Sequence, residues 1–227
     1  MSYRLFVLAA LLAAACPATA TVLTPVPLFD TSGNDSGWDA YLYDAAHTGV
    51  TVDAVGGGVA YIRLEIAKSF TQPPVGSAFP TNVIQFVQRN DDAHTAPVIQ
   101  ITDEAIINQT GLDWTDYHWQ ISGNGAFDKT ATDGSGFSIA PFTLKAWGSP
   151  PSGWSSGYAD SLALSGGTVP NGGSFFPGNA AGILYLTADL SGDGPATLTL
   201  TQYPTPEPAS LALILGGATA LVFRRRK

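Results

Sequence analysis

Alternation of apolar and polar residues is the feature that most constrains how this chain can fold. The run YIRLEIAKSF at 61–70 places an isoleucine or leucine at every second position of its first six residues. The runs GILYLTADL at 182–190 and ATLTLTQ at 196–202 show a similar period. Successive side chains of a β-strand point to opposite faces of the sheet, so each run predicts a strand with one buried face.

Clusters of glycine, proline, serine, asparagine and aspartate separate these runs. Further segments with strand character lie at 49–55, 83–88, 97–102, 115–121 and 160–164. The chain contains 25 glycines and 16 prolines, and only 12% of its residues are charged. Many short strands with such turns, and no strong amphipathic helix, predict a single all-β domain at 21–203. We expect a two-sheet β-sandwich of jelly-roll or immunoglobulin-like type.

The body of the chain is strongly acidic once its basic ends are set aside. Between Thr21 and Tyr203, five lysines and arginines stand against 17 aspartates and glutamates, which gives a net charge of −12. Such a body repels nucleic acid and anionic lipid, so we expect no nucleic-acid partner. Charged partners would be cations, including divalent metals. The alternative is that the acids only keep an exported protein soluble.

The N-terminus has the three parts of a secretory signal peptide. Arg4 supplies a positive start, an eleven-residue apolar run follows, and Ala18 and Ala20 form an A-x-A cleavage site. The apolar run is too short to span a bilayer and has the length typical of a signal-peptide core. Residues 1–20 are therefore predicted to be a signal peptide that signal peptidase removes after Ala20.

The chain's one cysteine, Cys16, lies within this predicted signal peptide. The mature chain would then contain neither a thiol nor a disulfide, and its core alone would have to hold it together. Lipoprotein processing at Cys16 is the alternative, although Ala13 stands where a lipobox prefers leucine.

The C-terminus consists of an apolar segment and a basic end. Residues 209–223 contain no charge and would form a helix about 22 Å long, short of the ~30 Å hydrocarbon core. Long cationic side chains can extend the reach of such a span, so we predict a transmembrane helix there. The basic end would stop transfer and stay on the cytoplasmic side. Its residues are Arg224, Arg225, Arg226 and Lys227.

This tail, residues 204–227, resembles the PEP-CTERM sorting signal. The motif Pro206-Glu207-Pro208 is followed by the apolar segment and then by the basic end, in the order typical of that family. Thr205 stands where family members frequently have valine. The resemblance implies that a membrane-embedded exosortase recognises the motif and cuts near it. The body would then reach the cell surface or the medium, often together with exopolysaccharide. An anchor that is never cut is the alternative.

The stretch TDEAIINQTGLDWTDYHW at 102–119 resembles uncharacterised proteins of the same PEP-CTERM group, and that resemblance implies no activity. Trp114, Tyr117 and Trp119 within it could stack on sugar rings, but their spacing also suits a strand that packs aromatics into a core. Four acids nearby would suit a glycoside hydrolase, with one carboxylate as acid and another as base or nucleophile. They are Asp103, Glu104, Asp113 and Asp116. We favour the core interpretation, assign no catalytic residue and predict that the protein is not an enzyme.

The loop DLSGDG is the candidate for a metal site. Asp189, Ser191 and Asp193 occupy positions 1, 3 and 5 of an EF-hand-like loop, and their oxygens suit calcium. Position 12 is Leu200, where a glutamate is expected, so an ordinary hairpin turn is the alternative. No other cofactor is predicted, and the chain's three histidines lack zinc-binding spacing.

Together these features predict an exported protein, held for a time in the inner membrane and then placed at the cell surface or released. We expect a structural or adhesive role in exopolysaccharide or biofilm. A carbohydrate-binding module is the alternative, and a glycan hydrolase is the third candidate. The module would use some of Trp38, Trp114, Trp119, Trp147 and Trp154. Exposed indoles would favour the module, and a cleft with two carboxylates would favour the hydrolase.

Overall fold

The computed structural model describes residues 21–22, 25–44, 49–73, 79, 81–89, 94–178 and 181–206. The predicted signal peptide and the tail from Glu207 onward lie outside these residues. Within the described part, α1 (Lys129–Gly134) is the one α-helix, and no helix there is long and apolar enough to cross a membrane. The rest of the described chain is strands and the loops between them, which confirms the mostly-β prediction.

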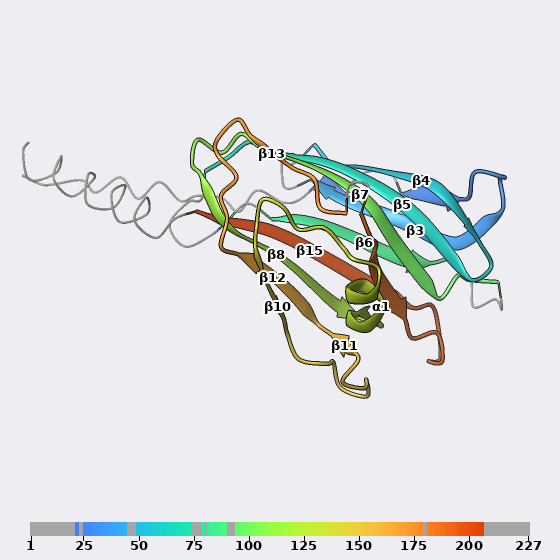
Figure 1. The fold of residues 1–227 in the computed structure, drawn as a ribbon. Helices are drawn as coiled ribbons and strands as arrows, with labels where there is room; N and C mark the ends of the chain where they lie inside the picture. Colours follow the sequence, from blue (N-terminus) through green and yellow to red (C-terminus); the bar gives the residue numbers. More distant parts are fainter. Residues whose placement is uncertain are drawn as a thin grey trace, which may run out of the picture.

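The strands form two sheets (Figure 1). The eight-stranded sheet runs in the order β1 (Thr21–Val22), β3 (Asp35–Asp44), β6 (Asn82–Gln88), β15 (Thr197–Pro206), β8 (Trp114–Gly123), β12 (Ser161–Ser165) and β10 (Leu144–Trp147), with β2 (Val26–Phe29) also paired to β3. The seven-stranded sheet runs in the order β11 (Tyr158–Ala159), β9 (Gly125–Asp128), β14 (Leu184–Ala188), β7 (Val98–Asn108), β5 (Tyr61–Phe70) and β4 (Thr51–Gly58), with β13 (Ser174–Phe175) also paired to β7.

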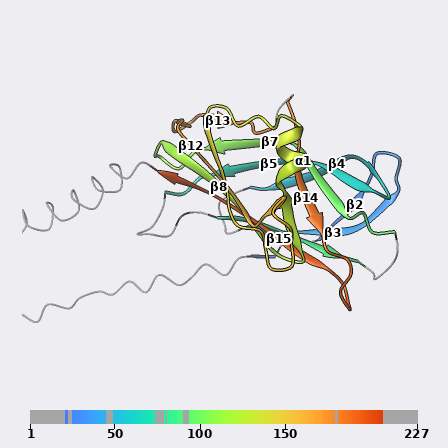
Figure 2. The same cartoon turned by 60° about the horizontal axis from the view of Figure 1, so that its bottom comes forward.

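The two sheets face each other, as the turned view in Figure 2 shows, and one hydrophobic core lies between them. Ring contacts join the layers: Phe70 of β5 lies 5.4 Å from Trp114 of β8, centroid to centroid. In β5 the buried positions alternate along the whole strand, from Ile62 to Phe70, as the sequence period predicts. The alternation therefore identified both the strand and its inward face.

One edge of the seven-stranded sheet curls toward the other sheet. β5 and β7 pair in parallel, although most neighbouring strands here are antiparallel. β4, the strand beyond β5, contacts both β2 and β3 of the opposite sheet. The curl therefore brings β4 against the first strands of the eight-stranded sheet on this side of the core.

The last strand extends beyond residue 203, where the sequence predicts that the domain ends. β15 continues to Pro206, and Pro204 and Pro206 pair with Tyr117 and Trp114 of β8. Pairing with β6 on the other side ends at Gln202. The two prolines therefore lie where β15 has a neighbour on one side only, and proline is tolerated at such edges because it lacks the N–H donor.

Seven strands of the described chain lie outside the ranges predicted from the sequence: β1, β2, β3, β9, β10, β11 and β13. β3 does alternate, with Trp38, Ala40 and Leu42 buried, but its other face carries two tyrosines.

Candidate functional site

The aromatic residues of β8 lie in the core. Trp114, Tyr117 and Trp119 expose 1%, 0% and 0% of their areas, and Trp38 on β3 is equally buried. This confirms the core interpretation of the WTDYHW segment. Three of the five tryptophans, Trp38, Trp114 and Trp119, are therefore too buried to stack on a sugar ring.

A polar network lies between the sheets among these aromatics. Its centre is Glu104 on β7, which is fully buried. Lys68 Nζ on β5 lies 3.1 Å from Glu104 Oε1, and Gln202 Nε2 on β15 donates to the same oxygen at 3.0 Å. Trp119 Nε1 donates to Glu104 Oε2 at 3.1 Å, and the Tyr117 hydroxyl donates to Gln202 Oε1 at 3.1 Å. Each of these side chains has a partner, which is the condition for charges to persist in a core.

Burial shifts the titration of two members of this network. It lowers the pKa of the Lys68 amine, although the nearby Glu104 carboxylate opposes the shift. It raises the pKa of the Tyr117 phenol well above its usual value, and the charge of Glu104 acts in the same direction. The phenol therefore stays protonated as a donor, while the amine gives up its proton more readily than an exposed lysine.

Three of the four acids considered for glycoside hydrolysis lie apart from one another. Glu104 is enclosed between the sheets. Asp113 is exposed and accepts from the backbone N–H of Asn171 at 2.8 Å. Asp116 lies on the outer face of β8 and accepts from Thr205 Oγ1 at 3.1 Å. These three carboxylates lie in three separate environments; the side chain of Asp103 falls outside the described part.

The outer face of β8 and β15 carries a small aromatic group. The His118 imidazole stacks on the Tyr203 ring, with centroids 4.8 Å apart and planes 13° apart. Gln120 Nε2 donates to the Tyr203 hydroxyl at 3.1 Å. Burial lowers the pKa of His118, and the nearby Asp116 opposes this more weakly. The stacked imidazole therefore gives up its proton more readily than an exposed histidine.

The loop predicted to bind calcium is closed by its own hydrogen bonds. Asp189 Oδ1 accepts from the backbone N–H of Ser191 at 3.0 Å and from its hydroxyl at 2.6 Å. These bonds lower the pKa of Asp189, and Asp193 is exposed. Among the described residues, no group of three or more His, Cys, Asp or Glu side chains could hold a metal. His94 is exposed and His47 lies outside the described part. Calcium binding by Asp189, Ser191 and Asp193 stays a prediction.

A hollow of about 310 Å³ opens beside this loop. Trp154, from the loop between β10 and β11, forms one part of it, and Asp189, directly after β14, forms another. The remaining lining residues are Ser152, Gly153, Thr187 and Ala188. Tyr158 packs edge-on against the Trp154 indole at 4.7 Å and limits its movement. Small-molecule sites begin at about 300 Å³, so the hollow has room for a ligand of monosaccharide size.

The other partly exposed indole, Trp147, is already engaged. Its Nε1 donates to the Asp133 carboxylate at 3.2 Å, and Lys145 Nζ lies 5.8 Å above its ring. Trp154 is consequently the described tryptophan best placed to stack on a ligand.

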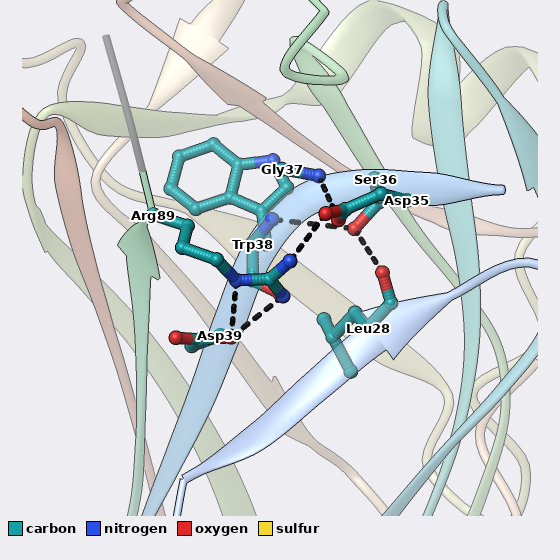
Figure 3. Close-up of polar contacts among 7 residues, drawn as sticks. All are labelled: Leu28, Asp35, Ser36, Gly37, Trp38, Asp39 and Arg89. Carbon is teal, nitrogen blue, oxygen red and sulfur yellow. Dashed lines mark hydrogen bonds and ion pairs between the residues drawn. The ribbon is translucent and has the colours of Figure 1, made fainter. Parts of the chain in front are cut away.

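A second charged cluster lies where β3 begins and β6 ends (Figure 3). Arg89 Nε and Nη2 donate to Asp39 Oδ1 at 3.0 and 2.7 Å, and Nη1 pairs with Asp35. Nη2 also donates to the Trp38 carbonyl at 3.1 Å. The hydrogen bonds to Asp39 are the largest cause that raises the pKa of Arg89. The cluster fastens the end of β6 to the start of β3.

Most of the sorting signal falls outside the described residues. Pro206 is the last residue of β15. Glu207, Pro208 and the basic end Arg224, Arg225, Arg226 and Lys227 lie beyond it, and so do Ala18 and Ala20 at the other terminus. The predicted sites of signal peptidase and exosortase therefore stay predictions.

Comparison with known proteins identifies no family. No family model matches the chain, and no curated protein matches it. A cupin 2 domain-containing protein from Halorhodospira halophila is similar at 7% identity over 89% of this chain and 96% of its own, with a TM-score of 0.18. An L-ribose isomerase from Acinetobacter sp. DL28, in complex with L-ribose, is similar at 12% identity over 80% of this chain and 74% of its own, with a TM-score of 0.20. Likenesses this weak carry no argument about fold or function.

Two features escaped the sequence analysis. The hollow joins the loop between β10 and β11 to the end of β14, which is distant in the chain, and no local pattern signals it. The buried network did leave a signal, because Lys68 continues the inward series of Ile62, Leu64 and Ile66 in β5. A lysine on the buried face of a strand implies a buried acid opposite, but the pairing with Glu104 required knowledge of the strand order.

Proposed function

We propose that this chain is an exported PEP-CTERM protein, sorted by an exosortase, that acts as a structural or adhesive component of exopolysaccharide or biofilm. It is a cell-surface or released protein and not an enzyme. One structural observation supports the proposal: Pro206, the first residue of the sorting motif, pairs with Trp114 of β8 where β15 has a strand neighbour on one side only. The motif therefore begins within β15, directly at the folded body and without an intervening spacer.

The experiment expresses the full chain in a bacterial host with and without a co-expressed exosortase. We expect the host to remove residues 1–20 in both cases, and to release the body from the membrane only when exosortase is present. Glu207→Ala should leave the chain membrane-bound, and Thr205→Val is the matched control because it restores the residue typical of the family. A full-length chain in the cytosol, uncut at either end, would refute the proposal.

A second candidate function, a carbohydrate-binding module, is favoured by the hollow at Trp154. An aromatic face beside a carboxylate and hydroxyl groups suits a sugar, because the ring stacks while the polar groups accept and donate hydrogen bonds. Binding of an exopolysaccharide panel, with and without calcium, tests this. Trp154→Ala should abolish binding and Trp147→Ala should preserve it. Saccharide release during the incubation would instead show an enzyme.

The finer fold assignment accompanies this proposal. The two-sheet arrangement suits a surface module, and it is common to jelly-roll and immunoglobulin-like domains. The choice between these two types stays a prediction.

A further inference from the structure

The inter-sheet network places an amine, a carboxyl group and a primary amide in sequence. Lys68 Nζ and Gln202 Nε2 both contact one atom, Glu104 Oε1, at 3.1 and 3.0 Å. The amine and the amide nitrogen therefore lie no farther apart than the sum of these two distances. The acyl carbon is bonded directly to that nitrogen, and the four rotatable bonds of the lysine side chain let the amine move toward it.

The orientation of the amide is fixed by its other neighbour. Tyr117 donates its hydroxyl proton to Gln202 Oε1 at 3.1 Å, so the carbonyl oxygen faces a donor and the amide nitrogen faces the carboxylate. The raised pKa of the phenol keeps that proton in place. A donor aimed at a carbonyl oxygen polarises the bond and stabilises the negative charge that develops when a nucleophile adds to the carbon.

We propose that Lys68 and Gln202 become joined by an intramolecular amide bond, formed by the folded protein itself with Glu104 as the proton carrier. Glu104 takes one proton from the Lys68 ammonium, and the neutral amine adds to Gln202 Cδ. Tyr117 stabilises the resulting oxyanion. Glu104 then passes a proton from the attacking nitrogen to Nε2, the Cδ–Nε2 bond breaks, and ammonia leaves as the Nζ–Cδ bond remains. The step involves no redox change and no co-reactant.

The surroundings favour this step over its competitors. Lys68, Glu104 and Gln202 expose 2%, 0% and 0% of their areas, so water that would hydrolyse the acyl group is excluded. Burial also lowers the pKa of the amine, which increases the neutral fraction able to attack. Holding the reacting groups in one folded site removes much of the entropic cost of bringing them together.

The product would be a covalent link between the two sheets, because Lys68 belongs to β5 and Gln202 to β15. The mature chain is predicted to lack cysteine, so this bond would do what a disulfide does in other exported domains. The amide-bond proposal does not depend on the sorting signal or on the glycan site. It can therefore fail while the proposed function holds, and the proposed function can fail while it holds.

The intact mass of the purified protein, measured under denaturing conditions, tests the proposal. We expect a mass lower than that of the processed sequence by one ammonia. After proteolysis, a branched peptide should join the segment containing Lys68 to the segment containing Gln202. A mass that matches the sequence would overturn the proposal. So would a loss of ammonia located at any other pair of residues or at an asparagine.

Variants separate the bond-forming step from simple packing. Glu104→Gln keeps the shape and the contact with Trp119 but removes the proton carrier, so the folded variant should retain its full mass. Lys68→Met should do the same. Lys145→Met is the matched control, since that lysine lies at the surface beside Asp133, and it should still lose ammonia. Because the wild-type mass alone can refute the proposal, a variant that fails to fold leaves the test intact.

Discussion

Two charged clusters of this protein use similar groups in opposite surroundings. In the inter-sheet network, the side chains of both Lys68 and Glu104 are 0% exposed. In the β3–β6 cluster, the Arg89 side chain is 26% exposed and its partner Asp35 is 49% exposed. Both clusters join strands that lie far apart in the chain.

The comparison shows how burial changes the contribution of an ion pair to stability. A buried pair is costly to desolvate, so removal of one partner leaves an uncompensated charge in the core. A surface pair gains little over hydration and is weakened by salt. Disruption of the inter-sheet network should therefore change the free energy of unfolding strongly, whereas disruption of the β3–β6 cluster should change it only slightly.

The largest effect is expected from breaking the inter-sheet pair on one side. Lys68→Met leaves the Glu104 carboxylate buried without a cation, and the added change Glu104→Gln removes that charge while it keeps a partner for Trp119. We expect the single variant to be less stable than the double variant by about 3 kcal/mol in urea unfolding. Both variants lack the proposed amide bond, so its loss cancels in the comparison. Equal stabilities would show that the charge is not the important feature of the network.

The next effect concerns backbone geometry beside the β3–β6 cluster. Gly37 has φ +79°, and a Cβ there would lie 2.8 Å from Thr95 Cα. Gly37→Ala should therefore lower the free energy of unfolding by about 2–3 kcal/mol, from the φ cost plus overpacking. Gly33→Ala is the matched control, because Gly33 has φ +81° but nothing within 4 Å of the added carbon. It should cost about 1 kcal/mol. An equal loss at both positions would contradict the packing argument.

The two clusters also differ in how far the sequence could predict them. The period of two identified β5, β14 and β15 with their inward faces, because alternation depends only on local chain geometry. Lys68 could be assigned to the buried face in this way. Glu104 and Gln202 could not be assigned as its partners. They lie on β7 and β15, and the order of the strands in the two sheets, which the sequence does not reveal, brings these strands to opposite sides of the core.

The candidate site at the hollow was even less accessible to sequence reasoning. Trp154 and Asp189 lie in different loops, and each alone resembles an ordinary turn residue. The sequence favoured burial of Trp114 and Trp119. It could not tell which of the other three tryptophans would be exposed, because their burial depends on neighbours that are distant in the chain. Tertiary placement, not residue type, separated the one available indole from the buried ones.

A smaller effect is expected from the β3–β6 cluster itself. Arg89→Leu removes the hydrogen bonds to Asp39 and the pairing with Asp35, and it should lower the free energy of unfolding by about 1 kcal/mol. The loss should shrink when the experiment is repeated at high salt, because the wild-type pair is partly exposed and screened. A loss as large as that of the Lys68→Met variant would contradict the distinction drawn from burial.

The smallest effect is expected at His118, which is half-buried and so intermediate in burial between the two clusters. Burial lowers its pKa below 6.5 in the folded protein, so near that pH the unfolded chain binds more protons than the folded one. Stability should therefore fall as the pH is lowered through 6.5 toward the folded pKa, and be regained above 6.5. The urea midpoint measured from pH 7.5 to pH 5 checks this. His118→Gln cannot titrate and should flatten that part of the profile. A wild-type profile that rises as the pH falls would mean that the Asp116 charge outweighs burial, and the outer face of β8 would then behave like the β3–β6 cluster.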